Sequence, residues 1–401
     1  MNPHASQLPL PDKYALAQSN ALKAIIIQAI EQHQGKISFS QFMQMCLYQP
    51  GLGYYVAGSH KFGEGGDFVT APELTPLFSH CLAEQCAQVI REMNHSADIL
   101  EFGAGRGVMA ADVLLSLEQL KCLPKNYFIL ELSPELRQRQ QQTLKTKAPH
   151  LYDCVTWLES LPDDESFKGI ILANEVLDAM PVERVRIYRH GEFKQLMVAL
   201  DADQFVYVEQ DLKNVDIKKH MQSIFHLVED MESEFIDVEI NTSLQPWLQS
   251  VYQILHRGLV LLIDYGYPDY EYFHPQRRRG TLACHYQHRV HDDAFVYVGL
   301  QDITAHVDFS DLAQRAENIG FDLLGYTSQA HFLTACGIEE KLQNLDQSDV
   351  KRFLSLVQPV KRLLMPQDMG EQFKVIALGK QLKQELVGFS LINQSGKLKS
   401  F

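Results

Sequence analysis

The spacing of apolar residues predicts mostly helical structure in the first quarter of the chain. Apolar side chains recur at helical intervals over residues 18–33, and Ser38 is positioned to cap a second helix that ends near Tyr48. A longer helix is expected over residues 72–93. Residues 51–70 contain six glycines, which favours a long irregular loop, and loops of this length in a compact domain are usually functional.

Farther along the chain, short apolar strands alternate with amphipathic helices. Strands are expected at residues 99–102, 127–132, near Val155, and at 169–173, 259–264, 321–326 and 373–378. Helices are expected at residues 108–117, 134–147, 243–256 and 309–319. This alternation predicts a parallel sheet with helices on both faces, which is a doubly wound α/β fold. Two regions interrupt it: a β-rich hairpin with a turn at His190-Gly191, and an irregular, histidine-rich stretch over residues 265–308.

The composition is that of an ordinary globular protein with an acidic balance. The chain has 401 residues, of which 46% are hydrophobic, and its 50 acidic and 36 basic side chains give a formal charge of −14. This charge disfavours general nucleic-acid binding and suits a basic protein partner. The longest apolar run, residues 258–263, is too short for membrane insertion. The first residues do not have the pattern of a secretory signal sequence. Mitochondrial transit peptides are rich in arginine, and the first arginine of this chain is Arg91, so we expect a cytoplasmic protein.

A glycine-rich turn carries the strongest functional signal. A predicted strand runs straight into a predicted helix through Glu101-Phe102-Gly103-Ala104-Gly105-Arg106-Gly107. Glycines in such a turn let a ligand approach the backbone, and a helix N-terminus offers N–H groups that have no intrahelical partner. The next strand ends at Glu131, 28 residues after Gly103. That position suits a carboxylate that accepts hydrogen bonds from both hydroxyls of a ribose.

Two adenosine cofactors compete for this turn, and a tight turn that binds nothing is the third interpretation. A dinucleotide needs Gly-x-Gly-x-x-Gly and sets its pyrophosphate at the helix N-terminus. Here the spacing is Gly-x-Gly-x-Gly, and the carboxylate of Glu101 would repel a pyrophosphate but suits the ammonium of a methionine moiety. The carboxylates of Glu101 and Glu131 therefore favour S-adenosylmethionine, and a methyltransferase over a dinucleotide oxidoreductase.

Further motifs resemble the MidA-like family of class I S-adenosylmethionine-dependent methyltransferases, formerly a domain of unknown function. The resemblance spans roughly residues 35–380. Beside the glycine turn it rests on Tyr48-x-Pro50-x-x-Gly53-Tyr54-Tyr55, Gly66-Asp67-Phe68-x-Thr70-x-Pro72-Glu73, Asn174-Glu175-x-x-Asp178-x-x-Pro181, Asp264-Tyr265-Gly266, Gly280-Thr281-Leu282, His288-Arg289-Val290-His291 and Gln301-Asp302-x-Thr304-x-His306-Val307-Asp308-Phe309. Where the family has Phe-Phe-Asp-Ala, this chain has Val176-Leu177-Asp178-Ala179, which leaves both carboxylates of that motif in place.

The resemblance implies an activity and a fold. The family's eukaryotic relatives are mitochondrial protein-arginine methyltransferases that assist the assembly of respiratory complex I. A protein substrate, such as a subunit of a respiratory complex, is therefore implied. The implied fold is a doubly wound, seven-stranded class I methyltransferase (Rossmann-like) sheet with an N-terminal helical region and an inserted α+β region that covers the substrate.

The pattern and the resemblance together predict a division into six segments. They are an N-terminal helical and glycine-rich loop region (1–95), a cofactor-binding Rossmann-like half (96–183), an inserted β-rich substrate region (184–240), a return to the core sheet (241–264), an inserted lid (265–308) and the C-terminal part of the core domain (309–401).

The expected catalytic residues are carboxylates. The fourth strand is followed by Glu175 and Asp178, at the crevice where doubly wound folds bind ligands. For an arginine acceptor we expect Glu175 to grip the guanidinium and Asp178 to support it. The alternative is that both acids serve only the N-terminus of a helix. Asp67, in the glycine-rich loop, is a further catalytic candidate or an ordinary turn residue.

The remaining candidates line the cofactor and the substrate. The expected cofactor-binding residues are Glu101, Gly103, Ala104, Gly105, Gly107, Glu131, Leu132, Asn174, Thr70 and Glu73. The expected substrate-pocket residues are Tyr54, Tyr55, Tyr265, His288, His291 and His306, although such aromatic side chains are more often core. His288 and His291, followed by two acids, resemble a zinc site, but no further spaced pair of ligands supports one, so no metal is expected.

Two alternatives to protein-arginine methylation stay open. One is methylation of a small molecule or of RNA. The other is an assembly factor that binds S-adenosylmethionine and docks a partner protein. The sequence predicts no particular oligomeric state.

Overall fold

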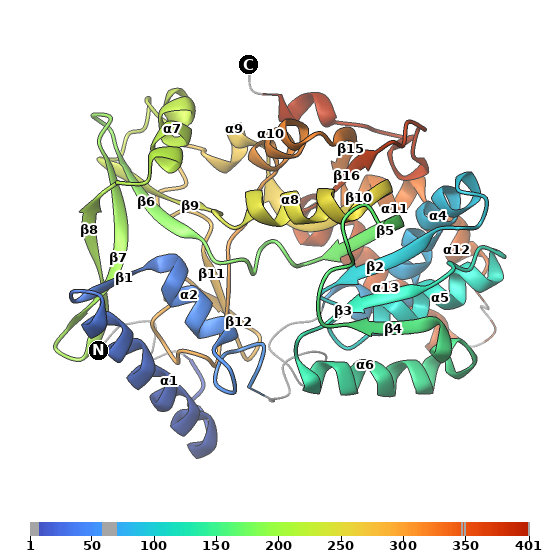
Figure 1. The fold of residues 1–401 in the computed structure, drawn as a ribbon, viewed down its shortest axis with the longest axis horizontal. Coiled ribbons are helices and arrows are strands. Elements are labelled where there is room, and N and C mark those ends of the chain that lie inside the picture. Colours follow the sequence, from blue (N-terminus) through green and yellow to red (C-terminus); the bar gives the residue numbers. More distant parts are fainter. Residues whose placement is uncertain (1–7, 58–69, 346–347, 349, 400–401) are drawn as a thin grey trace. The chain divides into compact units, whose positions relative to one another are not determined.

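The chain folds into two compact units. The computed structural model describes residues 8–57, 70–345, 348 and 350–399. The first unit comprises Met1–Phe68, Asp178–Leu244 and Pro268–His306, and the second comprises Val69–Leu177, Gln245–Tyr267 and Val307–Phe401. Each unit is therefore assembled from segments that lie far apart in the sequence, and Figure 1 labels their helices and strands.

The second unit is built around a mostly parallel sheet. Its strands follow the order β15-β16-β10-β5-β2-β3-β4, and the short strand β14 pairs with β10. The strands are β2 (Asp98–Phe102), β3 (Tyr127–Leu130), β4 (Val155–Leu158), β5 (Phe167–Asn174), β10 (Leu255–Tyr267), β14 (Val307–Asp308), β15 (Asp322–Ser328) and β16 (Phe373–Lys380). Only β16 pairs antiparallel, with β10 and with β15. The prediction of an α/β fold with a mainly parallel sheet is confirmed.

Helices cover both faces of this sheet. They are α3 (Ala71–Leu74), α4 (Pro76–Glu92), α5 (Val108–Gln119), α6 (Pro134–Lys147), α8 (Leu244–Ile254), α10 (Phe309–Ile319), α11 (Gln329–Ala335), α12 (Ile338–Gln343) and α13 (Val350–Leu364), with short 3-10 helices at Pro149–Cys154, Val387–Phe389 and Ser395–Leu398. Every residue of β10 from 259 to 263 is buried. Because successive side chains of a strand point to opposite faces, burial of all five requires cover on both sides.

The first unit is antiparallel. One sheet has the order β1-β7-β6-β9 with β8 paired to β7, and a second has the order β12-β11-β13. The strands are β1 (Lys36–Ser38), β6 (Glu183–Tyr188), β7 (Phe193–Asp201), β8 (Gln204–Asp211), β9 (Phe235–Ile240), β11 (Ala283–Tyr286), β12 (Arg289–His291) and β13 (Asp302–Thr304). The helices are α1 (Lys13–Gln32), α2 (Phe39–Tyr48), α7 (Val215–Ile224) and α9 (Asp269–Tyr272), with a 3-10 turn at Phe225–Leu227.

Two sequence predictions need correction. The single helix expected over residues 72–93 is two helices, α3 and α4, because Thr75 between them is extended and Pro76 begins the second helix. The region 265–308 is not irregular throughout, because it contains the sheet formed by β11, β12 and β13. Its strands are only three or four residues long, so they carry little alternating pattern. Among the described residues, no helix has both the length and the apolar character needed to span a membrane.

Candidate active site

The glycine turn between β2 and α5 is sharply bent. Gly103, Gly105 and Gly107 have φ angles of +63°, +51° and +79°, in a region that residues with a Cβ rarely adopt. A Cβ on Gly103 would lie 2.7 Å from Cγ2 of Val176, and one on Gly107 would lie 3.0 Å from Cα of Gln140. A Cβ on Gly105 would meet nothing within 4 Å among the described residues. The backbone at Gly105 is therefore open to a ligand.

The helix after the turn begins without a side-chain cap. Gly107 is the N-cap residue of α5, and within the described part of the chain no side-chain hydrogen bond caps this helix. The N–H of Gly107 donates to the carbonyl of Ala104 at 2.7 Å, which closes the turn. The first N–H groups of α5 thus keep the partial positive charge of a helix N-terminus, which favours electron-rich ligand atoms.

The carboxylate of Glu131, just after β3, is held at both oxygens. Its Oε1 accepts a hydrogen bond from the N–H of Ser133 (2.8 Å), and its Oε2 accepts one from Nε2 of Gln140 (2.9 Å). Burial raises the pKa of Glu131, and these hydrogen bonds oppose the rise. The two carboxylate oxygens together have about four lone-pair sites, so these partners leave room for a ligand hydroxyl. A fixed pair of acceptors fits a ribose diol, and the neighbouring Leu132 is 75% exposed.

Glu101 lies in the core at the end of β2. It is 1% exposed, and its Oε2 accepts a hydrogen bond of 2.6 Å from the hydroxyl of Tyr127. Burial raises the pKa of Glu101 to about 7, although the hydrogen bond from Tyr127 lowers it. The sequence analysis expected this carboxylate to face an ammonium group and gave no sign of the phenol. Its role toward the cofactor stays a prediction.

The carboxyl end of β5 carries a residue in an unusual backbone conformation. Glu175 has a φ of +53°, which is strained for a residue other than glycine. Its N–H donates to the carbonyl of Ile263 on β10 (2.9 Å), and its Oε1 accepts a hydrogen bond from Nδ2 of Asn174 (3.1 Å). Oδ1 of Asn174 is buried and accepts no hydrogen bond from the described residues. Asn174 follows Ala173, which pairs with Phe102 of β2, and Phe102 directly precedes the glycine turn.

A buried aspartate holds the same turn from the neighbouring strand. Asp264 on β10 is 1% exposed, and its two carboxylate oxygens accept hydrogen bonds from the N–H groups of Leu177 and Tyr265, each 2.9 Å long. The ring of Tyr265 packs edge-on against Phe373, with centroids 5.1 Å apart. Asp264 therefore ties the turn after β5 to β10. The sequence analysis noted Asp264 as part of a motif but gave it no role.

The segment before α4 reaches the glycine turn through an ion pair. Oε2 of Glu73 lies 3.9 Å from a guanidinium nitrogen of Arg106. Burial raises the pKa of Glu73, and Arg106 partly offsets this. Thr70 is the N-cap residue of α3 and its side chain makes no capping hydrogen bond. Both predicted residues thus lie in the second unit, with Glu73 beside the turn, whereas Asp67 falls outside the described residues.

In the first unit, predicted substrate residues gather around a buried carboxylate. The hydroxyl of Tyr55 donates to both oxygens of Asp302, at 2.9 Å each, and its ring packs edge-on against that of the buried Tyr54. Burial, Asp302 and Asp178 all raise the pKa of Tyr55. Asp178 is 4% exposed, and its carbonyl accepts a hydrogen bond from the N–H of Ala305 (3.0 Å). Tyr55 and Asp178 therefore lie near Asp302, which had been assigned no role.

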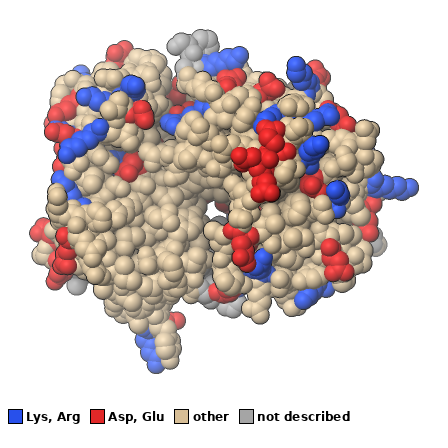
Figure 2. All heavy atoms as spheres, in the orientation of Figure 1, with Lys and Arg blue, Asp and Glu red and all other residues tan. Residues whose placement is uncertain are grey.

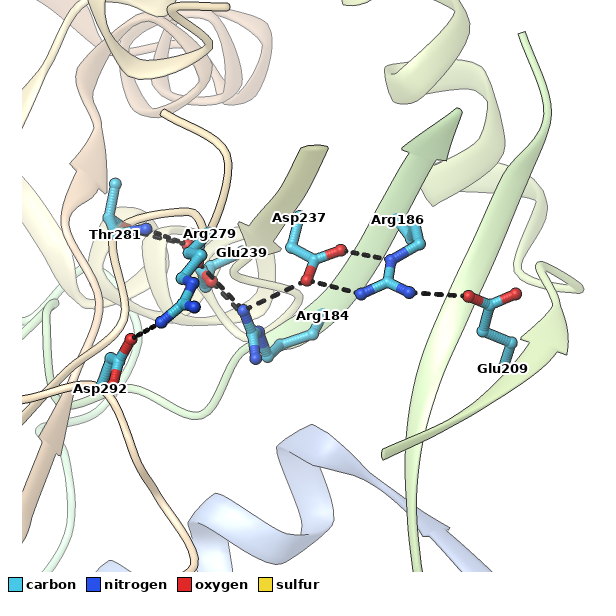
Figure 3. Close-up of polar contacts among 8 residues, drawn as sticks. All are labelled: Arg184, Arg186, Glu209, Asp237, Glu239, Arg279, Thr281 and Asp292. Carbon is cyan, nitrogen blue, oxygen red and sulfur yellow. Dashed lines mark hydrogen bonds and ion pairs between the residues drawn. The ribbon is translucent and has the colours of Figure 1, made fainter. Parts of the chain in front are cut away.

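A buried ion pair between β6 and β9 fixes the segment that carries His306. Nε of Arg184 donates to Oε1 of Glu239 at 3.2 Å, and both side chains are almost inaccessible (Figure 3). Oε2 of Glu239 accepts hydrogen bonds from the N–H and the hydroxyl of Thr281, at 2.7 and 3.0 Å. Oγ1 of Thr281 in turn accepts a hydrogen bond from the N–H of His306 (3.1 Å). This network positions His306 within the first unit.

The two other predicted histidines lie at a hairpin. His288 is exposed, with a φ of +61°, in the turn between β11 and β12. His291 is half-buried, and its Nδ1 accepts a hydrogen bond from the N–H of Asp293 at 3.3 Å. In the described ranges, no group of three or more histidine, cysteine, aspartate or glutamate side chains is arranged to hold a metal ion.

The residues present fit S-adenosylmethionine. The turn is open at Gly105, Glu131 offers two fixed acceptors, and Asn174 holds a buried acceptor without a partner. These groups lie at the carboxyl ends of β2, β3 and β5, the edge of a doubly wound sheet where ligands bind.

Comparison with known proteins identifies the family. A family model of S-adenosyl-L-methionine-dependent methyltransferases matches residues 81–327, which is more than half of the chain. The chain belongs to this family, so the predicted MidA-like methyltransferase and its cofactor, S-adenosylmethionine, are confirmed.

Individual relatives agree with this assignment. A crystal structure of a COG1565 superfamily member from Burkholderia thailandensis, bound to S-adenosyl-homocysteine, is 42% identical, with a TM-score of 0.92 over 97% of this chain and 100% of that one. The mitochondrial protein arginine methyltransferase NDUFAF7 of Danio rerio is 27% identical over 86% of this chain and 83% of its own. The human protein of the same name is also 27% identical, over 86% of this chain and 80% of its own.

The expectation of a cytoplasmic protein is contradicted by these comparisons. The curated relatives from vertebrates, the fly and the nematode are all mitochondrial. The expectation rested on the first residues of the sequence and on their lack of arginine.

Proposed function

We propose that this protein transfers a methyl group from S-adenosylmethionine to an arginine side chain of a protein substrate. The names of the relatives support an arginine acceptor. The observation that carries the proposal is Glu175, a carboxylate in a strained conformation at the carboxyl end of β5. Doubly wound folds bind their ligands at this edge of the sheet. An arginine acceptor needs an anion there to hold its guanidinium and to take its proton.

Glu175 can supply both requirements. A guanidinium is a poor nucleophile because it is charged, with a pKa of about 13.8 in water. A carboxylate that holds two of its N–H groups in a fork orients both nitrogens. One of these held nitrogens passes a proton to Glu175 as it gains the methyl group from the sulfonium, and S-adenosyl-homocysteine leaves. Asn174 orients the carboxylate through its hydrogen bond to Oε1, and we propose Asp178, three residues on, as the supporting acid.

We propose the following roles for the other candidates. The backbone of the glycine turn and Asn174 bind the methionine end of the cofactor, and Glu101 contributes negative charge there. The residues that follow β3 bind the adenosine end. The residues concerned are Gly103, Ala104, Gly105, Gly107, Asn174, Glu101, Thr70 and Glu73 for the methionine end, and Glu131 and Leu132 for the adenosine end. Methyl transfer is an in-line displacement, so this positioning supplies much of the catalysis.

The finer architecture belongs to the same proposal. The path of seven strands from β15 to β4, with β14 added at the side of β10, supports a doubly wound class I methyltransferase sheet. We propose that the first unit, which contains the β-rich segment 184–240 and most of the segment 265–308, selects the acceptor. Tyr54, Tyr55 and His306 are its candidate contacts, and Asp67 is a candidate for catalysis in the glycine-rich loop.

Charge favours a protein over RNA as the acceptor. The net charge is −14, and on the face in Figure 2 the lysine and arginine side chains of the described residues are interspersed with acidic and uncharged ones. Such a surface attracts a basic peptide and repels a phosphate backbone. A subunit of a respiratory complex is the acceptor that the family resemblance implies.

Glu175→Gln tests the proposal, with Glu317→Gln, an exposed change on α10, as the matched control. Methyl transfer from tritium-labelled cofactor to a protein substrate is measured beside the affinity for S-adenosyl-homocysteine. We expect kcat to fall by about 10²–10⁴-fold while cofactor affinity changes little. Unchanged turnover would contradict the role of Glu175. Full biological rescue by the inactive variant would instead favour a docking function.

A further inference from the structure

Gln140 differs from the rest of its helix. α6 is a polar helix, in which only Gln140 and Leu144 are buried, and Gln140 is 0% exposed. A buried primary amide is costly unless its donors and acceptor find partners. In the second unit both amide hydrogens and the amide oxygen of Gln140 have partners, and these partners lie at the ends of three different strands.

The two amide hydrogens of Gln140 reach both elements of the cofactor site. Nε2 donates to the carbonyl of Gly105 at 3.0 Å and to Oε2 of Glu131 at 2.9 Å. The backbone of Gln140 also packs closely against Gly107, since a Cβ on Gly107 would lie 3.0 Å from Cα of Gln140. One side chain therefore links the open glycine turn after β2 to the carboxylate after β3.

Trp157 on β4 fixes which way the amide faces. Its Nε1 donates to Oε1 of Gln140 at 2.9 Å. Indole nitrogen is only a donor, so the amide oxygen must face Trp157 and the NH₂ group must face Gly105 and Glu131. A flipped amide would place its oxygen against a carbonyl and a carboxylate, and would leave the indole N–H facing NH₂. The orientation of Gln140 is thus determined by its partners.

We propose that Gln140 is a positioning residue that selects the cofactor's ribose by holding Glu131 and the glycine turn in one geometry. With Ser133 bound to Oε1 and Gln140 bound to Oε2, the plane of the Glu131 carboxylate is fixed. Preorganised acceptors bind a diol more tightly than mobile ones, because less freedom is lost on binding. The inference rests on the proposed role of Glu131 at the ribose.

The test compares two ligands on five proteins. Calorimetry measures the Kd of S-adenosyl-homocysteine and of its 2′,3′-dideoxy analogue for the wild type, Gln140→Leu, Glu131→Gln, the double variant that combines these two changes, and Gln138→Leu. Gln138, on the same helix, is exposed and serves as the matched control. We expect Gln140→Leu to raise the Kd of S-adenosyl-homocysteine about tenfold and the Kd of the dideoxy analogue less than twofold. The control, Gln138→Leu, should change neither Kd. Adding Glu131→Gln to Gln140→Leu should cause little further loss.

An equal increase in the Kd of both ligands in Gln140→Leu would overturn the inference, because it would mean that Gln140 has a structural role only. No weakening of either ligand would overturn it as well. If Glu131→Gln keeps the wild-type preference for the diol, the ribose role of Glu131 fails, and the inference fails with it. Methyl transfer to arginine is measured separately, so the proposed activity can survive that outcome. Thermal unfolding of each variant confirms that the compared proteins are folded.

Discussion

Gly103 lies against Val176, so close that a Cβ on the glycine would stand 2.7 Å from Cγ2 of the valine. Gly103 begins the turn after β2, and Val176 follows Glu175 in the turn after β5. The adjacent strands carry these turns side by side, since Phe102 pairs with Ala173. Within the second unit, the turn assigned to the cofactor and the turn assigned to the acceptor therefore share a packing contact.

Gly103→Ala is expected to weaken S-adenosyl-homocysteine binding at least tenfold and to destabilise the fold by about 2–5 kcal/mol. About 1–2 kcal/mol comes from the left-handed backbone and about 1–3 kcal/mol from overpacking against Val176. Calorimetry and urea unfolding measure the two effects. Gly35→Ala is the control, because Gly35 has a φ of +87° with nothing within 4 Å. Failure of Val176→Ala to restore any of the loss would argue against the contact.

Glu101→Gln is expected to change how stability depends on pH. Burial raises the pKa of Glu101 from 4.5 to about 7 in the folded protein. Between these values the folded state binds more protons than the unfolded state, so the wild type loses stability as pH rises. The neutral variant lacks this loss, and its stability relative to wild type should increase on the order of 3 kcal/mol from pH 4.5 to 8. The free energy of unfolding of both proteins is measured in urea at each pH. Parallel pH profiles for the wild type and Glu101→Gln would contradict a raised pKa of Glu101.

Glu239→Gln is expected to destabilise the protein by at most about 3–5 kcal/mol. It removes the nearer of the two carboxylates beside the buried guanidinium of Arg184 and leaves only Asp237, at 3.9 Å. Arg184→Met combined with Glu239→Gln should recover part of this loss, since no buried charge is then left unpaired. The exposed pair of Arg137 and Glu159 is the control, and Glu159→Gln should have little effect. Equal losses for the buried and the exposed pair, measured by urea unfolding, would contradict the importance of burial.

Local signals in the sequence predicted much of the second unit. Ser133 and Pro134 define the start of α6, and the predicted range 134–147 is the observed one. The predicted helix over residues 309–319 also matches α10, which Asp308 caps and Gly320 ends. Ser38 likewise caps α2 as predicted. Caps, prolines and glycines act within a few residues, so single-sequence reasoning can find them.

The contacts that shape the site depend on residues far apart in sequence. Gln140 lies in a run of polar helix residues, and nothing in that run distinguishes the one glutamine that is buried against Gly105 and Glu131. Tyr55 and Asp302 are separated by 247 positions and meet only in the folded first unit. The glycine spacing could predict the cofactor because the turn is local. The side chains that hold the turn in place could not be predicted in this way.

The most direct test of the central claim is the chemical identity of the labelled residue. The protein is incubated with tritium-labelled S-adenosylmethionine and a candidate protein substrate, and the labelled product is hydrolysed and separated into its amino acids. The account predicts radioactivity in methylated arginine, and its absence from the product of Glu175→Gln. Label that resides in another amino acid would contradict it.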